Sequence, residues 1–193
     1  MKITVTFTSQ GRILEGGLFL PDKEQPEPTA ALLFEGSVTG ATSQVTEHLA
    51  REICKEGFVC MILDHSYYSD DESAPQPWES PAKRVEDIKA AMHFLQEQGT
   101  VDREKIIGVG VSVGAEYMAR AIQQTDICQG LVMIEGPNDD SQNLIGHVEI
   151  PSIVIEEQHL ESTVDQTVIW IRTLLNGQST RAHRESVHWS AAE

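Results

Sequence analysis

The first twenty residues alternate between apolar and polar side chains, which is the pattern of strands with one buried face. Ile3, Val5 and Phe7 alternate with threonines, and the Ser-Gln-Gly sequence at 9–11 favours a turn into the segment RILEGGLFLP. We therefore expect an N-terminal antiparallel hairpin. Residues 21–28 hold three prolines among charged residues, so this segment is expected to be an exposed loop.

From Thr29 onward, short apolar runs alternate with segments of helical periodicity. The runs are ALLF, FVCMIL, KIIGVGV, GLVMI and PSIVI. Strands that are apolar throughout are buried on both faces, which is typical of a mostly parallel sheet covered by helices. The predicted fold class is α/β, with a mostly parallel central sheet, an N-terminal antiparallel hairpin and helices on both faces. Residues 1–193 are expected to form a single domain.

Three of the helical segments carry boundary signals. Ser43 is a candidate N-cap for the first, and Gly57 is a candidate stop. Ser80, followed by proline, is expected to open the second. Thr163 and Gln166 have the spacing of a capping box before the third.

The composition of the chain disfavours several classes of protein and of binding partner. The chain has 40% hydrophobic residues, and its start lacks the apolar core of a signal peptide, so we expect a cytoplasmic protein with no membrane partner. With 30 acidic and 14 basic residues, the formal charge of -16 opposes binding to nucleic acid. Three cysteines without C-x-x-C spacing predict buried, reduced thiols rather than a disulfide framework or a metal site.

The motif with the clearest chemical meaning is Gly-x-Ser-x-Gly at residues 110–114. An apolar run, KIIGV, precedes it, and a helical pattern follows it. Such a strand, sharp turn and helix hold a nucleophilic serine, with glycines where larger side chains would collide. The alternative is that Ser112 is an ordinary serine in a glycine-rich turn.

The segments LEGGLFLP, ALLFEGSVTGA, LAREICKEGFVCMILD, VDREKIIGVGVSVGA and IPSIVI resemble the α/β-hydrolase superfamily, and within it the dienelactone-hydrolase-like group. The resemblance covers most of the chain and implies the α/β-hydrolase fold. It places Ser112 at the position of the nucleophile. Dienelactone hydrolases have a cysteine there, whereas this chain has the serine of most esterases, which leaves the substrate open.

The resemblance also implies a histidine base near the C-terminus and an acid after the last apolar run. His188 is the best match for the base, and His183 is second. The family's G-x-x-D pattern is replaced by EEQHLEST, from which we select Glu161 as the acid. Glu157 is an alternative, and so is the interpretation that these glutamates are only solvated surface charge.

For the oxyanion hole, the resemblance implies backbone N–H groups at Val113 and at the loop containing Gly36 and Ser37. Glu35 coincides with a glutamate that dienelactone hydrolases carry in this loop. It is predicted to contact the substrate or the nucleophile, or else to form the polar end of a strand.

The predicted function is a serine hydrolase that cleaves a small carboxylic ester, thioester or lactone and needs no metal or organic cofactor. The alternative is a catalytically weak or inactive binding module of the same fold. The chain ends five residues after His188, where relatives add a final helix. Either another subunit of a homo-oligomer covers the sheet there, or the sheet is left open, or the chain is a reduced variant.

Overall fold

A computed structural model describes residues 1–22, 25–36, 41–64, 80–134, 148–155 and 159–177. In these ranges, seven strands form one sheet in the order β1-β2-β4-β3-β5-β6-β7. The strands are β1 (Lys2–Ser9), β2 (Arg12–Phe19), β3 (Thr29–Glu35), β4 (Val59–Asp64), β5 (Val101–Val111), β6 (Cys128–Ile134) and β7 (Ser152–Ile155).

The N-terminal hairpin and the parallel sheet are both confirmed. Strands β1 and β2 pair antiparallel through a turn at Gln10 and Gly11, which have φ angles of 48° and 76°. Strand β2 also pairs antiparallel with β4, whereas the pairs β4–β3, β3–β5, β5–β6 and β6–β7 are all parallel. The carboxyl ends of β3, β5, β6 and β7 therefore lie at one edge of the sheet.

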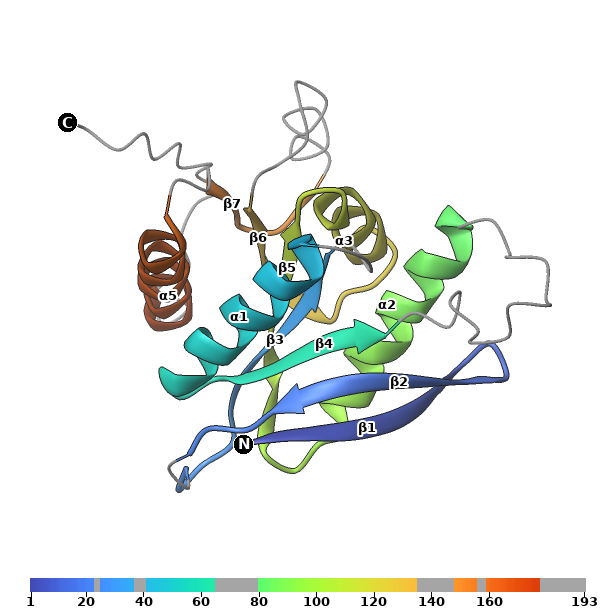
Figure 1. Cartoon of the computed structure of the whole chain (residues 1–193), viewed down its shortest axis with the longest axis horizontal. Helices are drawn as coiled ribbons and strands as arrows, with labels where there is room; N and C mark the ends of the chain where they lie inside the picture. Colours follow the sequence, from blue (N-terminus) through green and yellow to red (C-terminus); the bar gives the residue numbers. More distant parts are fainter. Residues whose placement is uncertain (23–24, 37–40, 65–79, 135–147, 156–158, 178–193) are drawn as a thin grey trace.

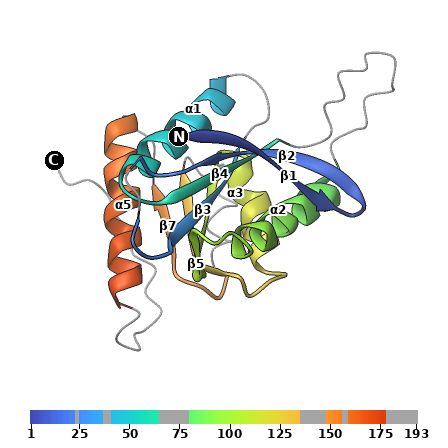
Figure 2. The ribbon, with the colours of Figure 1, turned by 90° about the horizontal axis from the view of Figure 1, so that it is seen from below.

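Helices cover both faces of this sheet, as predicted. They are α1 (Ala41–Lys55), α2 (Pro81–Gln96), α3 (Gly114–Ile122) and α5 (Leu160–Gly177). Helices α1 and α5 contribute to one apolar core, and α2 and α3 contribute to the core on the opposite face (Figures 1 and 2). None of the helices in the described ranges combines the length and the apolar character needed to cross a bilayer.

Two predicted helix starts are wrong, and one is confirmed. Helix α1 begins at Ala41, so Ser43 lies inside it, and α5 begins at Leu160, so Thr163 lies inside it. The Thr163 hydroxyl donates to the carbonyl of His159 at 3.2 Å, because a threonine can bond back to the preceding turn instead of capping. Ser80 is the N-cap residue of α2, and Pro81 follows it, as predicted.

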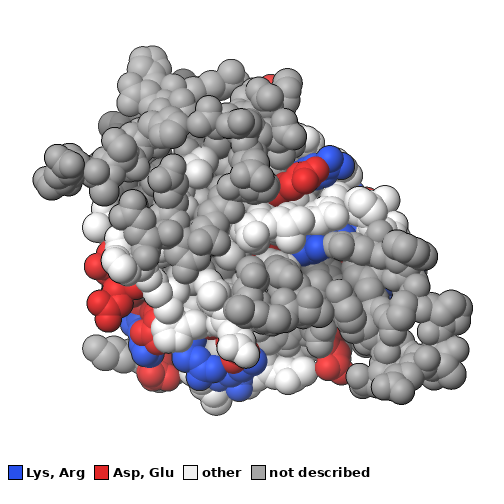
Figure 3. Space-filling view, turned by 45° about the horizontal axis from the view of Figure 1, so that its top comes forward, with Lys and Arg blue, Asp and Glu red and all other residues white. Residues whose placement is uncertain are grey.

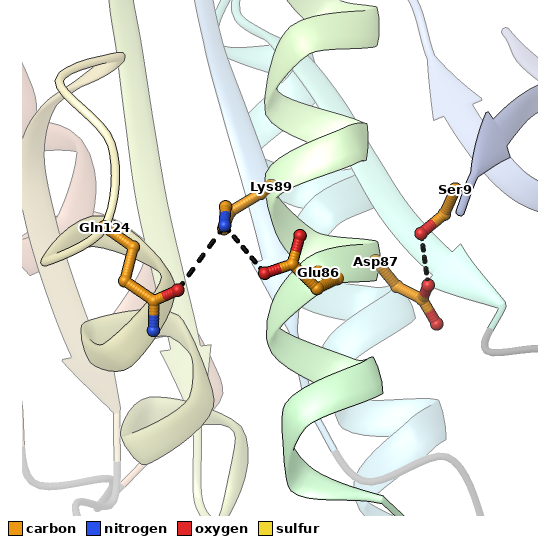
Figure 4. A network of polar contacts seen from close by, with 5 residues as sticks. All are labelled: Ser9, Glu86, Asp87, Lys89 and Gln124. Atoms are coloured by element: carbon orange, nitrogen blue, oxygen red, sulfur yellow. Dashed lines mark hydrogen bonds and ion pairs between the residues drawn. The ribbon is translucent and has the colours of Figure 1, made fainter.

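Polar contacts hold α2 on two sides, and Figure 4 draws both. On one side, the buried Asp87 carboxylate accepts hydrogen bonds from the Ser9 hydroxyl at 2.6 Å and from Arg12 at 3.2 Å, so α2 is tied to the N-terminal hairpin. On the other side, Lys89 donates to the Gln124 side chain just beyond the end of α3 at 3.4 Å. These contacts fix the position of α2 between the hairpin and α3.

On the surface, acidic and basic side chains lie next to one another despite the negative net charge. Figure 3 shows such neighbours on the part of that face that is not grey. Ion pairs of this kind join Lys2 and Arg51 to Glu47, and Arg120 to Glu116. Exposed pairs contribute at most about 1 kcal/mol each to stability, so the buried contacts dominate the fold.

The cysteines provide a test of the two apolar cores, because all three side chains are buried. Burial raises the pKa of Cys128 to about 12 and raises the pKa values of Cys60 and Cys54. The thiolate is the reactive form, so we expect the native protein at pH 8 to react negligibly with a disulfide reagent such as DTNB. After unfolding in guanidinium chloride, all three thiols should react. Rapid modification of any thiol in the native protein would contradict this packing.

Candidate active site

Ser112 lies in a sharp turn between β5 and α3. Its φ angle is +54°, a left-handed conformation that residues other than glycine rarely adopt. Its N–H donates to the carbonyl of Ile134 at 2.9 Å, and its carbonyl accepts from the N–H of Ala115 at 2.9 Å. The main chain of Ser112 is thus bonded to the neighbouring strand and to the start of the helix, and the residue is half-buried.

The two glycines of the motif are required by close packing. A Cβ atom at Gly110 would lie 2.3 Å from the Cα of Ala115, and one at Gly114 would lie 2.2 Å from the carbonyl oxygen of Glu35. Both distances are far below van der Waals contact. The glycine spacing therefore follows from the passage of the chain from strand to helix and from the contact between α3 and the end of β3.

The start of α3 presents backbone donors beside Ser112. Val113 is the N-cap residue, and the residue is 40% exposed. The first N–H groups of a helix have no partner within the helix, and the helix dipole makes this end partly positive. A developing negative charge near Ser112 would therefore be stabilised, which is the property expected of an oxyanion site.

Gly36, the second predicted part of the oxyanion hole, lies directly after β3 and against the start of α3. A Cβ atom at Gly114 would lie 2.8 Å from the nitrogen of Gly36, and one at Gly36 would lie 2.3 Å from the Thr46 hydroxyl of α1. The structure therefore brings Gly36 and the turn at Ser112 to the same edge of the sheet. Ser37 lies outside the described residues.

Glu35, predicted to contact substrate, is buried and paired with an arginine that the sequence analysis did not identify. Its Oε1 atom lies 2.5 Å from Nε of Arg84, and the two side chains are 1% and 2% exposed. The Arg84 guanidinium also lies over the ring of Tyr117, 4.2 Å from the centroid. A contact of Glu35 with substrate stays a prediction.

The sequence contains a signal that could have identified Arg84 as a buried, paired residue. It lies four residues before Ile88, on the inward-facing side of α2, where most positions are apolar. A charged residue on such a stripe indicates a buried partner. Nothing local identifies Glu35 as that partner, because 49 positions separate the two residues.

Of the residues proposed as base and acid, Glu161 lies within the described ranges. Glu161 is exposed in the first turn of α5, the helix that follows β7, and thus comes after a strand whose carboxyl end lies at the Ser112 edge. His188, His183 and Glu157 lie outside the described residues. Within the described ranges, no group of three or more histidine, cysteine, aspartate or glutamate side chains is placed to hold a metal ion.

The packing of Gly114 against β3 can be tested by substitution. We expect Gly114→Ala to lower the free energy of unfolding by about 2 kcal/mol or more, because the new methyl group would collide with backbone atoms that cannot move aside easily. Gly99→Ala is the matched control, since nothing lies within 4 Å of an added Cβ there, and it should change stability by less than about 1 kcal/mol. Equal denaturation curves for the two variants would contradict the contact.

No family model matches the chain. It is 28% identical over 128 residues to the uncharacterized protein YcjY of Escherichia coli K12, covering 64% of this chain and 42% of that protein. It is 30% identical over 105 residues to the thiohydrolase aneE of Aspergillus aculeatus, covering 54% of this chain and 32% of that protein. The chain thus spans less than half the length of these two relatives.

Solved structures extend the similarity to most of the chain. The dienelactone hydrolase of Anabaena variabilis superposes with a TM-score of 0.65 at 18% identity, covering 89% of this chain and 78% of that one. These comparisons confirm the predicted resemblance at the level of the fold: the chain has the α/β-hydrolase fold.

Proposed function

We propose that this protein is a serine hydrolase that cleaves a small carboxylic ester, thioester or lactone. The main support for this proposal is the position of Ser112. The residue lies in the turn between β5 and α3, has a left-handed backbone conformation and is half-buried. This turn lies at the edge of the sheet that holds the carboxyl ends of the parallel strands. In the α/β-hydrolase fold, this turn is where a nucleophile is held.

The proposed reaction uses an acyl-enzyme. The Ser112 hydroxyl attacks the carbonyl carbon while His188 takes its proton, and His188 then returns the proton to the leaving group. Water, activated by the same imidazole, releases the acid and regenerates Ser112. Glu161 would orient the imidazole, and N–H groups at Val113 and in the loop of Gly36 and Ser37 would stabilise the oxyanion. Protein groups suffice for this chemistry, so no cofactor is required.

The relatives support the class of reaction but not a particular substrate. A thiohydrolase and a dienelactone hydrolase are both among the proteins that this chain resembles. The first is matched over only 32% of its length, and the second at only 18% identity. We therefore keep esters, thioesters and lactones together as the proposed substrate class.

A second candidate function is a binding module of the same fold with little or no catalytic activity. The packing of Gly110 and Gly114 favours this candidate, because contacts with Ala115 and Glu35 explain both glycines without any reaction. The two candidates differ in one property. A hydrolase requires an activated hydroxyl at Ser112, whereas a binding module does not.

A fluorophosphonate probe separates the two functions. We expect the folded protein to be labelled at Ser112, because the probe reacts with a serine whose proton is accepted by a base. Ser112→Ala should abolish both labelling and hydrolysis of p-nitrophenyl acetate. The matched control is Ser162→Ala, an exposed serine in the first turn of α5, which should leave both unchanged. Absence of label on the folded protein, with a control esterase labelled in parallel, would reject the hydrolase.

The assignment of the base and the acid has its own test. We expect His188→Ala to lower kcat by about a thousand-fold or more, because the hydroxyl then lacks its proton acceptor. Glu161→Gln should lower kcat less, since it removes only the orienting charge. His93→Ala, at an exposed position on α2, is the control and should keep wild-type kcat. A loss in His183→Ala with normal activity in His188→Ala would transfer the role of base to His183.

A further inference from the structure

Arg84 makes several contacts at the oxyanion end of β3 although its side chain is almost completely buried. Its Nε atom donates to the Glu35 carboxylate, and its Nη2 atom donates to the carbonyl of Gly36 at 2.5 Å. The face of its guanidinium lies against the ring of Tyr117 in α3. One side chain of α2 thus connects the end of β3 with the helix that follows Ser112.

Contacts from three helices enclose Gly36. Thr46 of α1 fills the space where a Cβ would lie, and Gly114 of α3 packs against the peptide unit between Glu35 and Gly36. The carbonyl of Gly36, which belongs to the next peptide unit, is held by Arg84 of α2. Packing therefore fixes the first peptide unit, and a charge-assisted hydrogen bond holds the carbonyl of Gly36.

Gly36 is the residue of the predicted oxyanion loop that lies within the described ranges. Its N–H and its carbonyl belong to two planar peptide units that meet at its Cα atom. When Arg84 holds the carbonyl of Gly36, it restricts rotation of the backbone at this residue and so helps to keep the Gly36 N–H in place. An oxyanion donor is effective only if it is oriented before the charge develops.

We propose that Arg84 is a positioning residue for the oxyanion hole, a role that rests on the hydrolase function proposed above. In this role it acts through the Gly36 carbonyl and not through a bond to the substrate. The Glu35 carboxylate compensates its charge in the buried site and directs the guanidinium toward Gly36.

Arginine is suited to this role, and lysine is not. The planar guanidinium presents donors in a fixed fork, so Nε and Nη2 serve Glu35 and Gly36 at the same time, and its face stacks on Tyr117. A lysine ammonium is a compact point charge on a flexible stem and lacks this planar face. The contacts of Asp87 with the hairpin keep the turn of α2 that carries Arg84 in place.

The test compares kcat, KM and thermal unfolding in matched variants with p-nitrophenyl acetate as substrate. Arg84→Met alone would leave the Glu35 carboxylate buried without its cation, which destabilises proteins strongly. Glu35→Gln alone would likewise leave the Arg84 cation buried without its carboxylate. We therefore compare the double variant Glu35→Gln/Arg84→Met, which removes both charges, with the wild-type protein. Arg84→Lys is a second variant that retains the positive charge. Arg120→Met, an exposed arginine of α3, is the control.

We expect the double variant to have a kcat about a hundred-fold below that of the wild type, with KM changed by less than about three-fold and cooperative unfolding retained. Arg84→Lys should lose about ten-fold in kcat, and Arg120→Met should keep the wild-type value. An effect on KM alone, or a double variant that folds and has the kcat of the wild type, would overturn the role of Arg84. A folded Arg84→Lys with wild-type kcat also overturns it, whether or not the double variant folds.

The wild-type protein and the Arg84 variants test the two proposals separately. If the wild-type protein neither hydrolyses the ester nor takes a fluorophosphonate label on Ser112, the hydrolase function fails, and the role of Arg84 fails with it. If the wild-type protein is active and labelled while the folded Arg84 variants keep full kcat, only the role of Arg84 fails.

Discussion

The structure depends most on the contact between the first residue of α3 and the end of β3. Gly114 approaches the Glu35–Gly36 peptide so closely that even a methyl group would overlap it. Parallel pairing of Glu35 with Gly110 holds the two strands in register at the same level. Together these two constraints bring the turn at Ser112 and the residue after β3 to one edge of the sheet. The proposed nucleophile and the proposed oxyanion donors are neighbours because of this backbone contact.

The charges around the turn at Ser112 differ from the net charge of the chain. The chain is strongly acidic, yet the groups that face the turn at Ser112 include the partly positive start of α3. The buried pair of Arg84 and Glu35 carries no net charge, so it orients the Gly36 carbonyl without adding a monopole to the site. Such a pair gives little net stability compared with apolar packing. We interpret the pair of Arg84 and Glu35 as an interaction that fixes the backbone beside the proposed oxyanion hole.

Much of the fold is predictable from the sequence because apolar runs and glycine positions are local signals. The hairpin, the five apolar strands after Thr29 and the start of α2 at Ser80 all follow from such signals. The starts of α1 and α5 do not, because residues such as Thr163 can cap a helix or bond back to a carbonyl inside one. The sequence did not identify Glu35 as the partner of Arg84, because this pairing depends on how segments far apart in the sequence pack together. The turn at Ser112 was predictable because its motif requires a strand before it and a helix after it, and β5 and α3 meet this requirement. The role of Ser112 as nucleophile stays a prediction.

We propose that the turn after β5 holds a reactive hydroxyl beside preorganised backbone donors. A crystal structure of the protein after reaction with a fluorophosphonate tests this proposal. We expect a phosphorus atom bonded to the Ser112 oxygen, with the phosphonyl oxygen within hydrogen-bonding distance of N–H groups at Val113 and in the loop of Gly36 and Ser37. Unmodified Ser112, or a phosphonyl oxygen directed into solvent away from both groups, would contradict the proposal.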